Sequence, residues 1–201
     1  MVASRVSKVV ELARRKGLLR PRDLAEVGIA REYLRLAVER GLLERVARGL
    51  YRPVGATVSE HVSLAEVCKK APSGVICLLS ALSFHELTTQ LPRAVWLAVG
   101  PRARVPAIET VGLEVVRFSG RALTAGVETH DIGGVEARVF GAAKTVADCF
   151  KCRSRIGPDV AIEALRDALG QRKAAVDDLV RYGRICRVAE VMRPYVEAML
   201  A

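Results

Sequence analysis

The stretch LRPRDLAEVGIAREYLRLAVERGLLERVARGLYRP, residues 19–53, decides the fold of the first part of the chain. Pro21 suits the first turn of a helix, because its missing N–H would be unpaired there, and Asp23 favours the positive end of the helix dipole. We expect Leu24 and Val27 to face inward from this short helix. The pattern therefore predicts a helix that begins at about Pro21 and ends within two turns.

A second helix is expected after Gly28, which permits a tight turn that a side chain would obstruct. Its apolar positions recur at helical spacing and define a buried face: Ile29, Leu34, Ala37 and Val38. The opposite face is left to charged side chains: Arg31, Glu32, Arg35 and Glu39. A helix with one face turned to solvent in this position is typical of the recognition helix of a helix-turn-helix.

Two short apolar runs follow Gly41, at 42–46 and 50–52, and they predict a small β-hairpin. Upstream, residues 4–16 read as a further helix whose buried stripe is Val6, Val9, Val10 and Ala13. Three helices followed by a hairpin form a winged helix-turn-helix. The predicted fold class is α+β, with this N-terminal domain at residues 1–55 and a mixed α/β domain that ends in helices at residues 56–201.

Positive charge is concentrated in the N-terminal domain. The chain carries a net charge of +10 at pH 7, and residues 1–55 hold 13 Lys and Arg against six Asp and Glu. Such a distribution favours double-stranded DNA as the partner. An arginine bonds guanine O6 and N7 together, so we expect Arg31 and Arg35 to read bases, while Glu32 accepts from a cytosine amino group or pairs with an arginine. The other candidate DNA contacts are Arg22, Arg45, Arg48 and Arg52.

Composition limits the alternatives. The pI is about 9.8, and 51% of the residues are hydrophobic, which is enough for real cores. The sequence contains no apolar run of bilayer length and no signal-peptide core, so a cytoplasmic protein without a membrane partner is expected.

Five cysteines at irregular spacing argue against a disulfide framework. Cys149 and Cys152 form a CxxC inside a helical pattern, where buried or half-buried cysteines are the better interpretation than a metal or redox site.

The second domain alternates between strand and helix patterns. A helix is expected at 59–70, a strand at 74–79 and a helix at 80–88 that Ser80 caps. Further strands are expected at 94–99, 113–118, 127–132 and 135–140, the last two joined by Gly133-Gly134, which is a strong hairpin signal. Four helices complete the chain, at 142–153, 158–169, 175–184 and 188–200.

The sequence offers little catalytic chemistry. It has no glycine-rich phosphate loop, nucleophile elbow or HExxH motif. Asp131 and Glu136 flank the Gly-Gly turn with Arg138 nearby, whereas a nuclease hairpin would pair its carboxylates with a lysine and a metal ion. His85 reads as a helix residue that caps or packs. We therefore expect no enzyme activity, cofactor or metal; a DNA-targeted nuclease or other DNA-modifying enzyme and a winged-helix protein-interaction module are the alternatives.

At four places the chain resembles the AbiEi-type antitoxins. RDLAEVGIAREYLRLAVERGLLERVARGLYRP resembles their N-terminal winged helix-turn-helix, in which Arg48-Gly49-Leu50-Tyr51 forms the wing. SALSFHELT, AKTVADCFKCRSRIGPDVAIEALRDAL and RYGRICRVAEVMRPYVEAML are similar to segments of the second domain. The motif residues there are Ser80, His85, Lys144, Thr145 and Asp148. Lys144 stands where arginine is usual, and Cys152 where an aromatic residue is expected.

The resemblance implies an antitoxin of a type IV toxin–antitoxin system that represses its own operon. The N-terminal domain would bind an operator with inverted repeats, as a possible dimer on the DNA, with Arg48 gripping the backbone. The second domain would be needed for antitoxicity. The functional counterpart implied is a nucleotidyltransferase-like toxin, without a stable complex between the two proteins.

Overall fold

The structure is a computed structural model that describes residues 2–16, 19–47, 49–55, 60–105, 108, 111–132 and 135–200. It divides into two compact units, one of residues 1–69 with 131–136, the other of residues 70–130 with 137–201. Most of α4 (Glu60–Lys70) is assigned to the first unit. The domain boundary after residue 55 stays a prediction. The fold class is α+β, as predicted, with helices and a hairpin first and a mixed α/β region after them.

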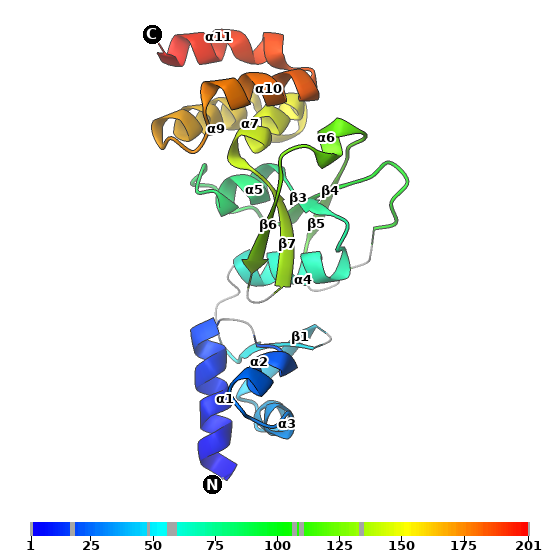
Figure 1. Cartoon of the computed structure of the whole chain (residues 1–201), viewed down its shortest axis with the longest axis vertical. Helices are drawn as coiled ribbons and strands as arrows, with labels where there is room; N and C mark the ends of the chain where they lie inside the picture. Colours follow the sequence, from blue (N-terminus) through cyan, green and yellow to red (C-terminus); the bar gives the residue numbers. More distant parts are fainter. Residues whose placement is uncertain are drawn as a thin grey trace. The chain divides into compact units, whose positions relative to one another are not determined.

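The first unit begins with three helices, α1 (Val2–Lys16), α2 (Pro21–Glu26) and α3 (Glu32–Glu39). They pack around one apolar core, with α1 beside α2 and α3 (Figure 1). The predicted stripe of α1 is buried, and so are Leu34 and Ala37 of α3. Val27 is an exception, because half of its surface is exposed where α2 ends. The expectation that Val27 faces inward is therefore wrong: residue 27 already belongs to the turn, where the helical spacing no longer applies.

The wing is an antiparallel hairpin of β1 (Leu43–Ala47) and β2 (Leu50–Pro53), with Glu44 opposite Arg52 and Arg45 opposite Tyr51. Gly49 has φ +73°, a conformation that side chains rarely adopt, and it lets the chain reverse. Leu19 exchanges two backbone hydrogen bonds with Tyr51, at 2.8 and 2.9 Å. The segment before α2 therefore joins the wing to the helices.

The second unit contains most of a five-stranded sheet in the order β5-β4-β3-β7-β6, of which the end of β6 and the start of β7 are assigned to the first unit. The strands are β3 (Val75–Ile76), β4 (Val95–Val99), β5 (Leu113–Arg117), β6 (Val127–Ile132) and β7 (Val135–Phe140). β4 is buried along its whole length, which explains its continuous apolar run. In β7 the buried residues Val135, Ala137 and Val139 alternate with Glu136 and Arg138, which are exposed and half-buried.

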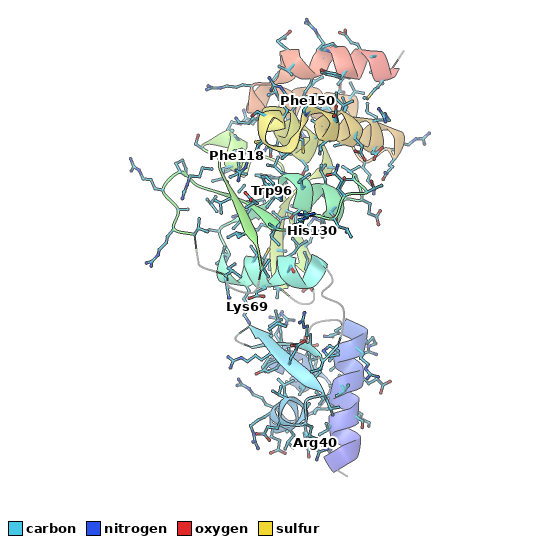
Figure 2. All side chains as sticks on the ribbon, turned by 180° about the vertical axis from the view of Figure 1, so that it is seen from behind. Arg40, Lys69, Trp96, Phe118, His130 and Phe150 are labelled. Carbon is cyan, nitrogen blue, oxygen red and sulfur yellow. The ribbon has the colours of Figure 1, made fainter. Side chains whose placement is uncertain are left out.

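Helices form layers against this sheet (Figure 1). The bounds are α5 (Leu78–Phe84), α6 (Arg121–Thr124), α7 (Ala142–Lys151), α8 (Arg153–Ile156), α9 (Pro158–Gly170), α10 (Val176–Cys186) and α11 (Ala189–Leu200). α7 packs against α5, α9 and α10, and α10 packs against α11. Figure 2 labels Trp96 and Phe118, which come from the sheet side, and Phe150, which comes from α7. All three belong to one apolar core, so α7 joins the sheet to the outer helices.

The sequence misplaces the start of α5. The predicted strand at 74–79 ends at Ile76, and the helix begins at Leu78 rather than at Ser80. Cys77, not Ser80, is the residue before the helix. Because residues 75–78 are all fully buried, their apolar character cannot separate the end of a strand from the first turn of a buried helix.

Candidate nucleic-acid interface

Helix α3 presents the predicted charged face to solvent. Arg31, Glu32, Arg35 and Glu39 are all exposed. The opposite face is fixed by Leu34 and Ala37 in the core, so the helix cannot turn its charges inward. Arg31 directly precedes the helix, at the end that a recognition helix directs toward base edges.

Arg35 forms an ion pair with Glu39, one turn further along α3. Both side chains are exposed, with 69% and 51% of their surface accessible. An exposed pair at this spacing stabilises a helix by only about 0.3–0.5 kcal/mol. Exchanging Glu39 for another hydrogen-bond acceptor therefore costs Arg35 little free energy.

The arginines of the wing differ in exposure and in their partners. Arg52 Nε lies 2.7 Å from Glu44 Oε1 of the opposite strand, and only 18% of the Arg52 side chain is exposed. Arg45 is exposed on β1. Arg48 lies outside the described residues. Of the predicted wing arginines that the structure describes, Arg52 pairs with Glu44 across the hairpin and Arg45 is exposed.

The start of α2 carries a charged cluster that the sequence identified only in part. Asp23 is almost fully buried, at 1% exposure, and accepts a hydrogen bond from the backbone N–H of Arg20 at 2.6 Å. Its carboxylate also pairs with Lys16 at 3.0 Å and with Arg20 at 3.2 Å. Burial raises the pKa of Asp23, but the hydrogen bonds from Arg20 and Lys16 outweigh it and leave the pKa below its usual range. The cluster thereby joins the end of α1 to the start of α2.

Arg22, also predicted to contact DNA, is exposed in the first turn of α2. It therefore joins Arg31, Arg35 and Arg45 as an exposed cation of this unit. Figure 2 shows charged side chains projecting from the unit, with Arg40 labelled just after α3. The arrangement is suited to a polyanion: arginines on the solvent side of a helix that the core holds rigidly.

Four of the five motif residues of the second unit, Ser80, Lys144, Thr145 and Asp148, are buried inside it, and His85 is half-buried. Ser80 is fully buried, and its Oγ accepts a hydrogen bond from the backbone N–H of Trp96 at 3.0 Å. His85 Nε2 donates to the carbonyl oxygen of Phe140 at 2.7 Å, and Thr145 Oγ1 donates to the same oxygen at 3.0 Å. These bonds hold α5 and the start of α7 to the ends of the strands.

Lys144 and Asp148 complete this arrangement in α7. Both are fully buried, and Lys144 Nζ lies 2.5 Å from Asp148 Oδ2 and 4.0 Å from the ring centroid of Phe140. Cys186 Sγ donates to the other carboxylate oxygen of Asp148, at 3.2 Å. Burial, and then the nearby Asp148 carboxylate, raise the pKa of Cys186 to about 12, which keeps its thiol protonated as the donor. Sequence reasoning missed the contact between Cys186 and Asp148, because α10 brings Cys186 to this point from 38 residues away.

The remaining sequence hypotheses concern the CxxC and the β6–β7 hairpin. Cys149 is buried in α7 and Cys152 is half-buried at its end, as expected. Asp131 and Glu136 are exposed, and Arg138 donates to the carbonyl oxygen of Ser73 at 3.0 Å. Gly133 and Gly134 lie outside the described residues. Among the residues that the structure describes, no three His, Cys, Asp or Glu side chains gather as metal ligands would.

Most of the segment from α1 to β2 matches a known protein family. Residues 7–54 match the family of transcriptional regulators described as AbiEi antitoxins. The resemblance to AbiEi antitoxins is thereby confirmed for residues 7–54, a segment that ends one residue after β2, the last strand of the wing. DNA binding and transcription regulation are what the family description supports for the segment.

The fold is also similar to that of a solved structure, the crystal structure of the RV2827C protein from Mycobacterium tuberculosis. The TM-score is 0.54 and the sequence identity 15%, over 89% of this chain and 71% of that chain. At this identity the likeness concerns the fold alone. None of the curated proteins compared with the chain matches it. No helix within the described ranges is long and apolar enough to cross a membrane.

Proposed function

We propose that this protein is the antitoxin of a type IV toxin–antitoxin system and represses its own operon by binding operator DNA. The observation that carries the proposal is the exposed charged face of α3, in a segment that matches AbiEi antitoxin transcriptional regulators. A cytoplasmic location, where the operator lies, belongs to the same proposal. No enzymatic step is part of it.

In this account α3 enters the major groove. Arg31 and Arg35 bond base edges, and Arg35 exchanges Glu39 for guanine O6 and N7. Glu32 accepts from a cytosine amino group or orients Arg31. Arg22 and Arg45 contact backbone phosphates and set the register, as do Arg48 and Arg52. Base reading on α3 thus supplies the sequence preference, and the surrounding arginines supply most of the affinity.

An inverted-repeat operator would be read by two copies of the chain. Their recognition helices then meet half-sites about 10 base pairs apart, or a multiple of that, because equivalent groove positions recur once per helical turn. The second copy is placed by the DNA, so the proposal requires a dimer on the operator and not in free solution.

The second domain carries the antitoxin activity in this proposal, against a nucleotidyltransferase-like toxin and without a stable complex. The buried positions of Lys144, Thr145 and Asp148 support a structural role for these motif residues. These residues would stabilise the fold of the domain, and residues on its surface would counteract the toxin.

Footprinting on the DNA upstream of the gene tests the proposal. We expect protection of two half-sites, and affinity that falls steeply with salt because bound arginines release counterions from the DNA. Incubation of the same complex with plasmid and Mg²⁺ or Mn²⁺ should leave the DNA intact. Nicked plasmid would instead support a DNA-modifying enzyme. The absence of a footprint, together with salt-insensitive binding to another protein, would support a protein-interaction module.

A further inference from the structure

A hollow of about 500 Å³ opens on α1 beside the turn between α2 and α3. Its lining combines an apolar part, Leu12, Val27 and Ile29, with charged side chains: Arg5, Lys8, Glu11 and Arg15. Leu12 is buried and Ile29 half-buried, but Val27 is 50% exposed. The hollow therefore presents an apolar side chain to water at a position where the sequence pattern predicts burial.

The charged lining is unbalanced. Within the described part of the chain, Lys8 and Arg15 form no ion pair, and Arg5 lies over the ring of Tyr33, 5.8 Å from its centroid. Lys16, also on α1, is already neutralised by Asp23 and Glu26. Three cations against the single carboxylate of Glu11 leave the hollow positive.

The spacing of these cations follows the helix. Residues 5, 8, 12 and 15 recur on one face of α1 at the 3.6-residue period. With a rise of about 1.5 Å per residue, Arg5 and Arg15 are separated by roughly 15 Å along the axis. The apolar side chain of Leu12 lies between the charged positions. A length of about 15 Å corresponds to nearly three turns of a partner helix.

We propose that this hollow, between the Arg5–Arg15 face of α1 and Val27, docks an acidic amphipathic helix of a partner protein. Its apolar stripe would cover Val27 and the exposed part of Ile29, and its carboxylates would pair with Arg5, Lys8 and Arg15. Helices bind hydrophobic grooves in this manner with apolar anchors three and four residues apart. Burial of Val27 and complementary charge at the rim supply the affinity and the selectivity respectively.

The same cations bind a DNA backbone less well. Phosphates gain nothing from the exposed Val27, whereas an apolar side chain of a partner helix covers it. None of the four charged positions on the solvent face of α3 lines the hollow. The docking proposal is thus independent of DNA recognition, and either one can fail alone.

Fluorescence anisotropy of a labelled peptide tests the proposal on the full-length protein. The probe is a 15-residue helix-forming peptide with leucines at i, i+3, i+4 and i+7 flanked by glutamates, and a control peptide carries lysines in place of the glutamates. The protein variants are Val27→Ser, which replaces the exposed apolar side chain with a smaller polar one, and Lys8→Glu/Arg15→Glu. Arg14→Ala is the matched control, since Arg14 is an exposed cation of α1 that does not line the hollow.

We expect the acidic peptide to bind the parent protein and the lysine peptide not to bind. Val27→Ser should weaken binding at least fivefold, Arg14→Ala by less than twofold, and the charge-reversed variant should prefer the lysine peptide. No binding of the acidic peptide, or equal binding by all variants, overturns the proposal. So does loss of operator affinity in the charge-reversed variant without any preference for the lysine peptide, which assigns the hollow to DNA. Concentration-dependent dimerisation that Val27→Ser abolishes assigns it to a second copy of the chain.

Discussion

The ammonium nitrogen of Lys144 lies 2.5 Å from a carboxylate oxygen of Asp148, one turn along α7, and neither side chain is exposed to solvent. The Phe118 and Phe140 rings lie 5.2 and 4.0 Å from the same nitrogen. Burial raises the pKa of Asp148, while Lys144 and the Cys186 thiol oppose that rise. Because both charges are buried, each is stabilised by the other, and the loss of one leaves the other uncompensated.

Removing one partner of this pair should cost much more than removing both. We expect Lys144→Met or Asp148→Leu alone to lower the free energy of unfolding by about 3–5 kcal/mol, because each leaves a buried charged group without its counterion. Lys144→Met/Asp148→Leu should recover most of that loss. Chemical denaturation of the four proteins measures the coupling; losses that simply add in the double variant would show that the pair is not coupled.

The Asp23 cluster makes the N-terminal domain sensitive to acid. The pKa of Asp23 is below that of an unfolded aspartate, about 3.9, so its stabilising effect is complete above that pH. Stability is lost as the pH falls through the lower, folded-state value. We expect Asp23→Asn to be less stable than the parent at pH 7 and to lose less on acidification, measured by thermal unfolding between pH 7 and pH 3. Parallel curves for the two proteins would contradict this.

His85 should add a second pH dependence, in the other unit. Burial lowers its pKa against the opposing effect of the Phe140 carbonyl and Glu128, and His130 and Lys173 lower it further. A histidine with a lowered folded-state pKa contributes fully above the unfolded value of about 6.5, and that contribution is lost as the pH falls below it. His85→Gln keeps a donor for Phe140 and does not titrate. We expect the parent to lose more stability than His85→Gln between pH 7 and pH 5, by denaturant titration; an equal loss would remove His85 as the cause.

Gly126 separates α6 from β6 in a conformation that side chains rarely adopt, with φ +70°. A Cβ there would lie 2.8 Å from Lys144 Cβ and 2.9 Å from the Tyr182 ring. Gly126→Ala should therefore lower the free energy of unfolding by more than about 1 kcal/mol, since the strain of the backbone adds to the clash. Gly170→Ala, at the end of α9, meets nothing within 4 Å and should leave stability unchanged or raise it. Differential scanning calorimetry compares the two; a Gly126→Ala protein as stable as the parent would contradict the close contact.

Local patterns predicted most of the elements of this fold. In β6 and β7 the alternation and the glycine pair between them place both strands at their observed bounds. The spacing in α3 identifies both its buried and its charged face, because a helix on the outside of a small core has one side in water. The start of α5 fails for the opposite reason: β3 and the first turn of α5 are buried all round, so no periodicity marks the change.

The contacts within the second unit could not be predicted from the sequence. Ser80 suits a helix N-terminus by type, yet it lies inside α5 and binds Trp96 on β4. The Lys144–Asp148 spacing suits an exposed i,i+4 pair equally well, and only the packing of α10 and the aromatic rings shows that the pair is buried. The Ser80–Trp96 hydrogen bond and the burial of the Lys144–Asp148 pair depend on which helices and strands pack together. The spacing of residues along the chain does not indicate this packing.

The central claim, that the exposed face of α3 reads DNA, is tested most directly by the affinity of Arg35→Ala for a duplex from the upstream region. Arg166→Ala is the control, since it removes the same charge from an exposed position in α9. Anisotropy titrations at fixed salt should show Arg35→Ala binding about 5- to 150-fold more weakly, or roughly 1–3 kcal/mol, with a reduced preference over an unrelated duplex. Arg166→Ala should bind like the parent. Equal affinity and equal preference for the parent and Arg35→Ala would contradict the account.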